Sequence, residues 1–215
     1  MSLAYEIDQA RTREEAPQPL TRQPLFVRYW IGQTISVFGD QISALAIPLT
    51  AILALDASAL QVGILASLAW LPHLLFSLPA GVWIDRREAR RHNMIVADIL
   101  RAASLATIPV AWWLGALTIW QLVAVAFAVG ALTVFFDLSS ASFFVALVDR
   151  TQYVDANSKL STSRSLSYIA GPTTAGLLVQ VLTAPVAIAT DALSFVASAI
   201  ALRDASAKRR AQEAS

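Results

Sequence analysis

Six long apolar runs, separated by short polar breaks, constrain this chain more than any other feature of its sequence. A transmembrane helix needs about 20 predominantly apolar residues, and the runs have this character. The predicted spans are 26–55, 60–84, 94–114, 119–147, 163–182 and 185–202. The runs do not alternate between apolar and polar residues, which favours helices over the strands of a membrane barrel. The sequence therefore predicts an all-α membrane protein with six transmembrane helices.

Composition agrees with a polytopic membrane protein. Hydrophobic residues make up 56% of the 215 residues and charged residues 14%, whereas a soluble domain has about 25% charged residues. The net charge of +1 gives no reason to expect nucleic acid as a partner. The absence of cysteine excludes disulfides and thiolate metal sites, and we expect neither a cofactor nor a metal.

Basic residues occur in alternate connections, which predicts the orientation of the chain. They lie before the first span, after the second and fourth spans, and after the sixth, whereas the connections at 56–59, 115–119 and 183–184 have none. Because lysine and arginine are retained in short cytoplasmic loops, we expect both termini to be cytoplasmic. The chain then divides into a flexible leader (1–24), a transmembrane domain (25–203) and a tail or the start of a linker (204–215).

The loop after the second span carries a specific motif. Gly81 is followed after three residues by Asp85-Arg86, and then by Arg90-Arg91. This pattern resembles the signature loop of the major facilitator superfamily, although Glu88 and Ala89 depart from its commonest form. The resemblance implies that the loop stabilises one access state by docking against the other half of a transporter. The same arginines could instead serve only as a topological anchor.

Longer stretches extend the resemblance over the whole chain. Residues 25–49, 146–180 and 189–202 are similar to the branch of that superfamily that contains macrolide-efflux proteins, enterobactin exporters and transmembrane secretion effectors. Within the fifth span, Gly171-Pro172 followed by Gly176 resembles an exporter motif. Proline would bend the helix there, and the glycines would allow a close helix approach. The resemblance implies one six-helix half of a transporter in a bacterial cell membrane.

Charged residues inside the predicted spans are the candidates for mechanism, because a charge in the bilayer interior is costly and usually functional. Asp40 shares a polar helix face with Gln33, and this unpaired carboxylate could exchange a proton. Asp137 is the second candidate carrier. Asp98 and Arg101 are three residues apart, a spacing that favours a structural or gating ion pair. Helix-to-helix hydrogen bonding is the alternative role for the smaller polar residues on these faces.

These observations favour a proton-coupled exporter of amphipathic small molecules such as drugs or siderophores. The expected partners are lipid, substrate, protons and a second six-helix half, because the superfamily normally has twelve spans. The chain could be a fragment or a half-size subunit, and a membrane scaffold without transport is the alternative function. An enzyme is disfavoured, since the sequence has no HExxH, GxSxG or P-loop motif.

Overall fold

The computed structural model describes residues 18–85 and 90–213, which are helical throughout apart from short connections. Six long helices lie in this part of the chain: α2 (Pro24–Leu55), α3 (Ala59–Asp85), α4 (Arg90–Trp113), α5 (Ile119–Leu147), α6 (Tyr153–Leu182) and α7 (Ala184–Glu213). Two short 3-10 helices, η1 (Leu20–Arg22) and η2 (Arg150–Gln152), precede α2 and α6. The predicted all-α architecture is confirmed.

Five of the six predicted spans are long and apolar enough to cross a membrane: α2, residues 59–81 of α3, α4, α5, and residues 184–203 of α7. Helix α6 is not among them, although it covers the predicted span 163–182. Its first turns, from Tyr153 to Arg164, are polar, and its second half is interrupted by the Gly171-Pro172-Thr-Thr segment. The fifth predicted span is therefore present as a helix of the bundle but lacks the composition of a typical membrane span.

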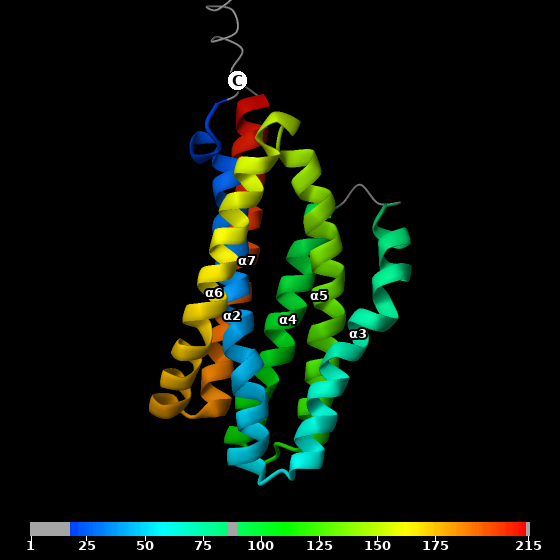
Figure 1. The fold of residues 1–215 in the computed structure, drawn as a ribbon, viewed down its shortest axis with the longest axis vertical. Coiled ribbons are helices and arrows are strands. Elements are labelled where there is room, and N and C mark those ends of the chain that lie inside the picture. The colour runs from blue at the N-terminus through cyan, green and yellow to red at the C-terminus, as the bar shows by residue number, and fades with distance from the viewer. Residues whose placement is uncertain (1–17, 86–89, 214–215) are drawn as a thin grey trace, which may run out of the picture.

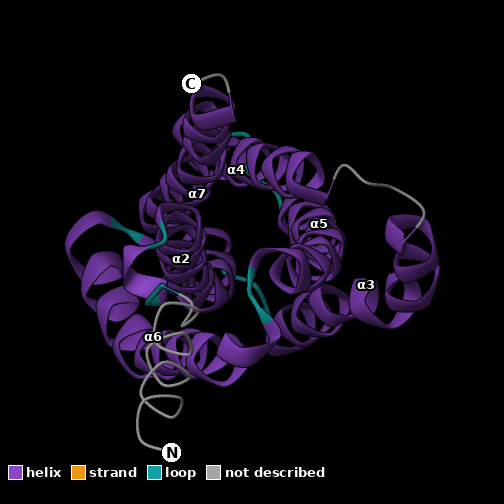
Figure 2. Cartoon of the chain, turned by 90° about the horizontal axis from the view of Figure 1, so that it is seen from above, coloured by secondary structure: helices purple, strands orange, loops and turns teal. Residues whose placement is uncertain are grey.

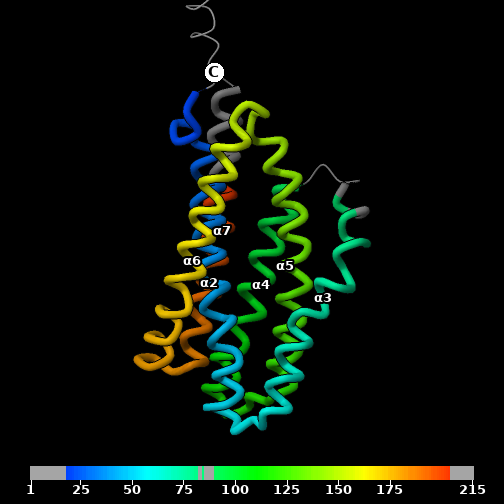
Figure 3. Tube along the Cα trace, in the orientation of Figure 1, coloured from blue at the N-terminus to red at the C-terminus, as the bar shows by residue number. Residues whose placement is uncertain are grey.

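The helices are arranged around a common centre when the bundle is viewed along its axis (Figure 2). Helix α2 packs against α6 and α7, α7 packs against α4, and α5 packs between α4 and α3. Helix α3 has few buried residues, and its second half diverges from the bundle (Figure 3). Two interior prolines, Pro72 and Pro79, account for its change of direction, because proline removes a helical hydrogen bond.

Local sequence explains where several helices begin and end. Pro24 occupies the first turn of α2, where its missing N–H group costs nothing. Asp56 ends the same helix in the left-handed conformation, with φ 49°, which Asp and Asn tolerate better than most residues. The Thr118 hydroxyl accepts a hydrogen bond from the Gln121 amide at the start of α5. The signals at Asp56 and Thr118 produce tight connections at the end of the bundle opposite the start of α2.

The two ends of the bundle differ in charge. Helix α2 begins, and the membrane part of α7 ends, at the end drawn uppermost in Figure 1. We call this the basic end, because it carries these basic residues: Arg22, Arg28, Arg90, Arg91, Arg150, Lys159 and Arg203. Residues 18–23, which the sequence places in the leader, pack here through Leu20, which is 1% exposed and contacts the cluster of Phe26, Val148 and Ala156.

Cysteine labelling is expected to place the basic end in the cytoplasm. Cysteines introduced at the exposed positions Ser58 and Ala116, in the connections at the opposite end, should react with an impermeant thiol reagent added to intact cells. A cysteine at His92, near the start of α4, should react only after the membrane is permeabilised. The native chain has no cysteine to confuse the assay. Labelling of position 92 from outside would reverse the predicted orientation.

Close approach between α2 and α7 depends on glycine. A Cβ atom placed on Gly39 would collide with the side chains of Asp191 and Ser194, and one on Gly32 would lie 3.4 Å from the Ser198 hydroxyl. Small residues at such positions allow helix backbones to approach closely and are the usual basis of packing within membranes. The α2–α7 contact is therefore set by two glycines, seven positions apart, that face serines of α7.

Substituting Gly39 with alanine is expected to destabilise the chain by about 1–3 kcal/mol, the usual cost of overpacking. The matched control is Gly63→Ala in α3, because an added Cβ at Gly63 meets no atom within 4 Å. That control should leave stability unchanged or raise it slightly, since alanine is the better helix former. Thermal unfolding in detergent measures both variants. If the Gly39→Ala and Gly63→Ala variants are equally stable, α2 and α7 do not pack as closely at Gly39 as the structure shows.

Candidate functional site

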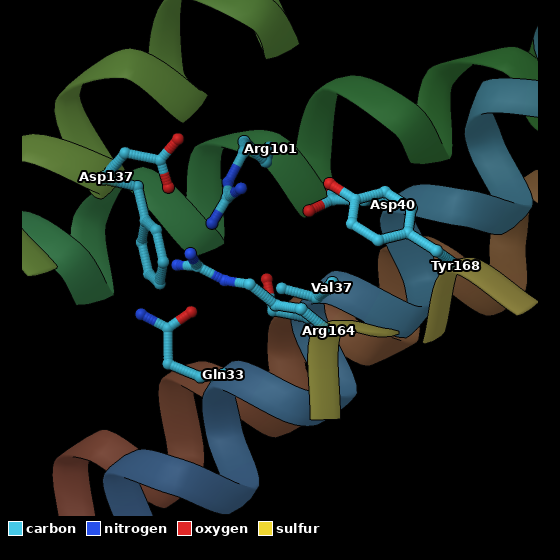
Figure 4. A pocket seen from close by; sticks show the side chains of 9 residues that line it. Gln33, Val37, Asp40, Arg101, Asp137, Arg164 and Tyr168 are labelled. Carbon is cyan, nitrogen blue, oxygen red and sulfur yellow. The ribbon is translucent and has the colours of Figure 1, made fainter. Parts of the chain in front are cut away.

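The main candidate site is a polar cavity near the middle of the helices, with a volume of about 210 Å³. Four helices contribute its lining residues: Gln33, Ser36, Val37 and Asp40 from α2, Arg101 from α4, Phe136 and Asp137 from α5, and Arg164 and Tyr168 from α6. Figure 4 shows these side chains around one shared space. The three residues assigned to a cavity from sequence, Gln33, Asp40 and Asp137, lie here together.

Helical periodicity explains how α2 supplies its part of the lining. Positions 33, 36, 37 and 40 recur at three- and four-residue steps, so they share one face. Gln33 and Ser36 are buried, whereas Asp40 is partly exposed to the cavity. Asp137 is exposed on the opposite wall. The cavity therefore holds two carboxylates on different helices, neither of which forms an ion pair within the described residues.

Arg101 is the most constrained charged residue of the site. Its side chain is 1% exposed and pairs with Asp98, whose side chain is fully buried, one turn earlier on α4. Its Nη1 atom also donates to the Thr133 hydroxyl of α5 at 3.3 Å. The guanidinium lies over the rings of Phe136 and Phe195, 4.3 and 4.1 Å from their centroids. Such cation–π contacts, together with the ion pair, compensate for the loss of water around the charge.

These contacts connect three helices, because Phe136 belongs to α5 and Phe195 to α7. The Asp98–Arg101 pair therefore exists in the bundle, and Arg101 also lines the cavity. Sequence reasoning assigned the pair a structural or a gating role. Both roles fit the geometry, because the Arg101 side chain is held by Asp98 on one side and lines the cavity on its other side.

Hydrogen bonds join α2 to α5 beside the cavity, towards the basic end. The Tyr29 and Ser140 hydroxyls are 2.8 Å apart, and Gln33 Nε2 donates to both of them. The Tyr29 ring also packs on Phe143, with centroids 5.6 Å apart. This network joins α2 to α5 on the side of the cavity that faces the basic end. Tyr29 was not identified from the sequence. Its only signal is that it lies three turns before Asp40 and therefore on the same face of α2.

Helix α6 supplies two residues that sequence reasoning missed as part of the cavity. Arg164 is one of the basic residues that follow the fourth predicted span, and Tyr168 is uncharged and belongs to no motif. They are four residues apart and therefore share a face of α6. A hydrogen bond from Trp30 Nε1 to the Ser163 hydroxyl, 2.8 Å long, holds this part of α6 against α2. The available signal was the position of Arg164 just inside the predicted span rather than in the loop.

The signature loop lies only partly within the described residues. Arg90 donates to the Ser142 carbonyl of α5 at 3.3 Å. Arg91 donates from two nitrogens to the Leu202 and Arg203 carbonyls of α7, both at 2.6 Å. The side chains of Asp85 and Arg86 lie outside the described residues. A Cβ on Gly81 would meet no described atom within 4 Å, so this glycine makes no close helix contact among the described residues.

The exporter motif of α6 shows one of the two predicted close approaches. A Cβ on Gly171 would collide with the Gln41 side chain of α2, whereas one on Gly176 would meet no atom within 4 Å. No described atom of this chain lies close to Gly176, so the predicted close approach is present at Gly171 and stays a prediction at Gly176. The helix continues across Pro172 from Tyr153 to Leu182.

Comparison with known proteins decides the family. The family model for the major facilitator superfamily matches residues 29–215, which is most of the chain. The chain belongs to the major facilitator superfamily. Members of this superfamily are membrane transporters rather than enzymes, so the chain is a multi-pass membrane protein of a transporter family. The predicted family and the prediction that the protein is not an enzyme are both confirmed.

Its curated relatives within the superfamily are distant. The chain is 28% identical over 175 residues to macrolide efflux protein A of Streptococcus pyogenes, a match that covers 81% of the chain and 43% of the relative. It is 29% identical over 133 residues to macrolide efflux protein A of Enterococcus faecalis, covering 62% of the chain and 41% of that protein. The chain thus spans less than half the length of these relatives. No solved structure is significantly similar to it.

Proposed function

We propose that this major facilitator chain forms one half of a proton-coupled exporter of amphipathic small molecules, such as drugs or siderophores, in a bacterial cell membrane. Both termini face the cytoplasm in this proposal, and Asp40 is the principal proton carrier, with Asp137 second. The observation that carries the proposal is the cavity, in which Asp40 and Asp137 face two arginines near the middle of the helices. Its relatives named as macrolide efflux proteins support the direction of transport.

The coupling argument follows from the cost of charge in the membrane. A carboxylate in the bilayer interior costs at least about 2.5 kcal/mol on insertion scales, and protonation removes its charge. Proton and substrate can therefore compete for the same polar wall, so that each favours a different access state. Asp40 suits this role because it lines the cavity and has no salt bridge of its own among the described residues.

Exposed apolar surface supports the need for a second half. Helix α3 exposes Trp70, Leu74 and Leu78 by 74%, 79% and 82%, and α6 exposes Leu166 and Ile169 by 62% and 74%. Both helices lie at the rim of the bundle, where α3 packs mainly against α5 and α6 mainly against α2 (Figure 2). Lipid or a second six-helix half can cover them. We propose the second half, because transporter sites form between two repeats.

Flux measurements in sealed vesicles test the proposal. The chain, co-reconstituted with its second half, should export a fluorescent amphipathic amine when a pH gradient is imposed and should stop when a protonophore collapses that gradient. Vesicles with the same protein and no gradient are the control. An export rate that does not change with the imposed pH gradient would contradict proton coupling. A complete absence of flux with an intact assembly would favour the alternative, a membrane scaffold that does not transport.

A further inference from the structure

Asp191 on α7 is a buried carboxyl group that lies outside the cavity described above. Its side chain is completely buried in the interface between α7 and α2. Gly39 provides the space, because a Cβ at that position would collide with Asp191 Oδ1 and with the Ser194 hydroxyl. The next residue of α2 is Asp40, which lines the cavity. The buried Asp191 and the cavity-lining Asp40 therefore lie on either side of α2, because Asp191 contacts Gly39, the residue before Asp40.

The hydrogen bonds around Asp191 are incomplete. Its Oδ1 atom accepts from the Ser194 hydroxyl at 3.0 Å. The hydroxyl of Ser43, which is 6% exposed, faces it from α2. Neither Asp191 Oδ2 nor Ser43 Oγ has a hydrogen-bond partner within the described part of the chain. Buried polar atoms are nearly always satisfied in folded proteins. These two oxygens can share one hydrogen bond, with Ser43 as donor to a carboxylate or as acceptor from a carboxylic acid, so the charge around Asp191 decides which form is present.

The charges that face Asp191 do not neutralise it. Helix α2 presents Asp40, and α4 presents Asp98 and Arg101. Arg101 forms its salt bridge with Asp98, and no described cation lies within salt-bridge distance of Asp191. The charged side chains of α6 are Asp155, Lys159 and Arg164, of which Lys159 pairs with Asp155 and Arg164 lines the cavity. An ionised Asp191 would therefore be a buried and uncompensated charge.

We propose that Asp191 is a second proton-binding residue, which exchanges its proton with the cavity through Asp40. A proton that binds Oδ2 converts the carboxylate to a carboxylic acid, and its new O–H group donates to Ser43 Oγ. Both unsatisfied oxygens then have a partner, and the uncompensated charge disappears. The role in coupling rests on the proposed function, whereas proton binding by Asp191 does not. Two sites would let a proton leave the cavity-facing carboxylate without leaving the protein.

Infrared spectroscopy of the purified chain in lipid tests proton binding directly, because a protonated carboxylic acid has a carbonyl stretch separate from that of a carboxylate. At a neutral pH, at which exposed carboxyl groups are ionised, we expect a band from Asp191 that is lost in Asp191→Asn. The matched control is Asp155→Asn, which changes a carboxyl group that is 58% exposed and should leave the band unchanged. An identical band in the parent and Asp191→Asn would overturn the proposal.

Ser43→Ala keeps the test valid if Asp191→Asn fails to fold. This variant retains Asp191 but removes the proposed acceptor, so the band should remain and move to higher frequency. An unmoved band would show that the proton is not shared with Ser43. The cation that binds could also be sodium instead of a proton. Replacing choline with sodium in the buffer at constant ionic strength tests this, because loss of the band in sodium would identify a sodium site and overturn the proton assignment. None of these readouts needs substrate, transport or a second half, so they can succeed even if export is disproved.

Discussion

Arg101→Ala is expected to destabilise the chain by about 3–5 kcal/mol, the usual cost of leaving a buried charge without its partner. Asp98 is completely buried and has Arg101 as its salt-bridge partner. The substitution also removes two cation–π contacts, to Phe136 and Phe195. Denaturant unfolding in mixed micelles measures the loss.

A double substitution distinguishes loss of the pair from loss of packing. Arg101→Leu combined with Asp98→Asn removes both charges and should recover most of the lost stability, because replacing a whole buried pair is far less costly than breaking it. The control is Lys159→Ala, which breaks the exposed pair with Asp155 and should cost at most about 0.5 kcal/mol. A single Arg101→Ala variant as stable as the parent would mean that Asp98 is not ionised in the folded chain.

Asp40→Asn in the complete assembly is expected to reduce gradient-driven efflux by roughly five- to a hundredfold, the range of an ordinary coupling free energy. Asparagine fills the same space at the cavity wall but does not exchange a proton. Substrate binding and expression should change much less than efflux, because the other lining residues remain. The measurement is initial efflux from proteoliposomes over a series of imposed pH gradients.

Asp56→Asn is the matched control for that experiment. Asp56 is an exposed carboxylate in the connection after α2 and adopts the left-handed conformation, which asparagine tolerates equally well. This variant should transport like the parent. If Asp40→Asn also transports like the parent at every gradient, Asp40 is structural, and Asp137 or the second half must carry the proton.

Much of the fold could be predicted from the sequence, because membrane helices are specified by local composition. The predicted span 119–147 coincides with α5, and most other boundaries agree within a few residues. The main exceptions are the end of α7, which lies at Glu213 rather than at Leu202, and the start of α6, which lies at Tyr153 rather than at Ser163. The first turns of α6 are polar, so hydropathy does not detect them. Helix formation needs only backbone hydrogen bonds and adequate propensity, whereas hydropathy detects membrane-facing surface.

The cavity could be predicted in part. Asp40 and Gln33 were identified because they are polar residues at helical spacing within an apolar span, and Asp137 because a charge inside a span is rare. Arg164 and Tyr168 were missed, because Arg164 ends the polar first part of α6 and Tyr168 follows it within one turn, beside two serines. A polar residue on a polar segment carries no signal of its own, and only the packing of α6 against α2 brings it to the site.

The sequence by itself determined the class, the helices, the charge asymmetry and the family, because each depends on composition, periodicity or a local motif. Only the tertiary structure decided which polar faces meet. Gly39 and Gly171 make close contacts, whereas Gly81 and Gly176 make none among the described residues. Likewise, Asp191 and Asp40 are 151 positions apart in the chain, yet they lie on either side of one α2 turn. Such neighbours are set by helix–helix packing, a long-range property that no local pattern encodes.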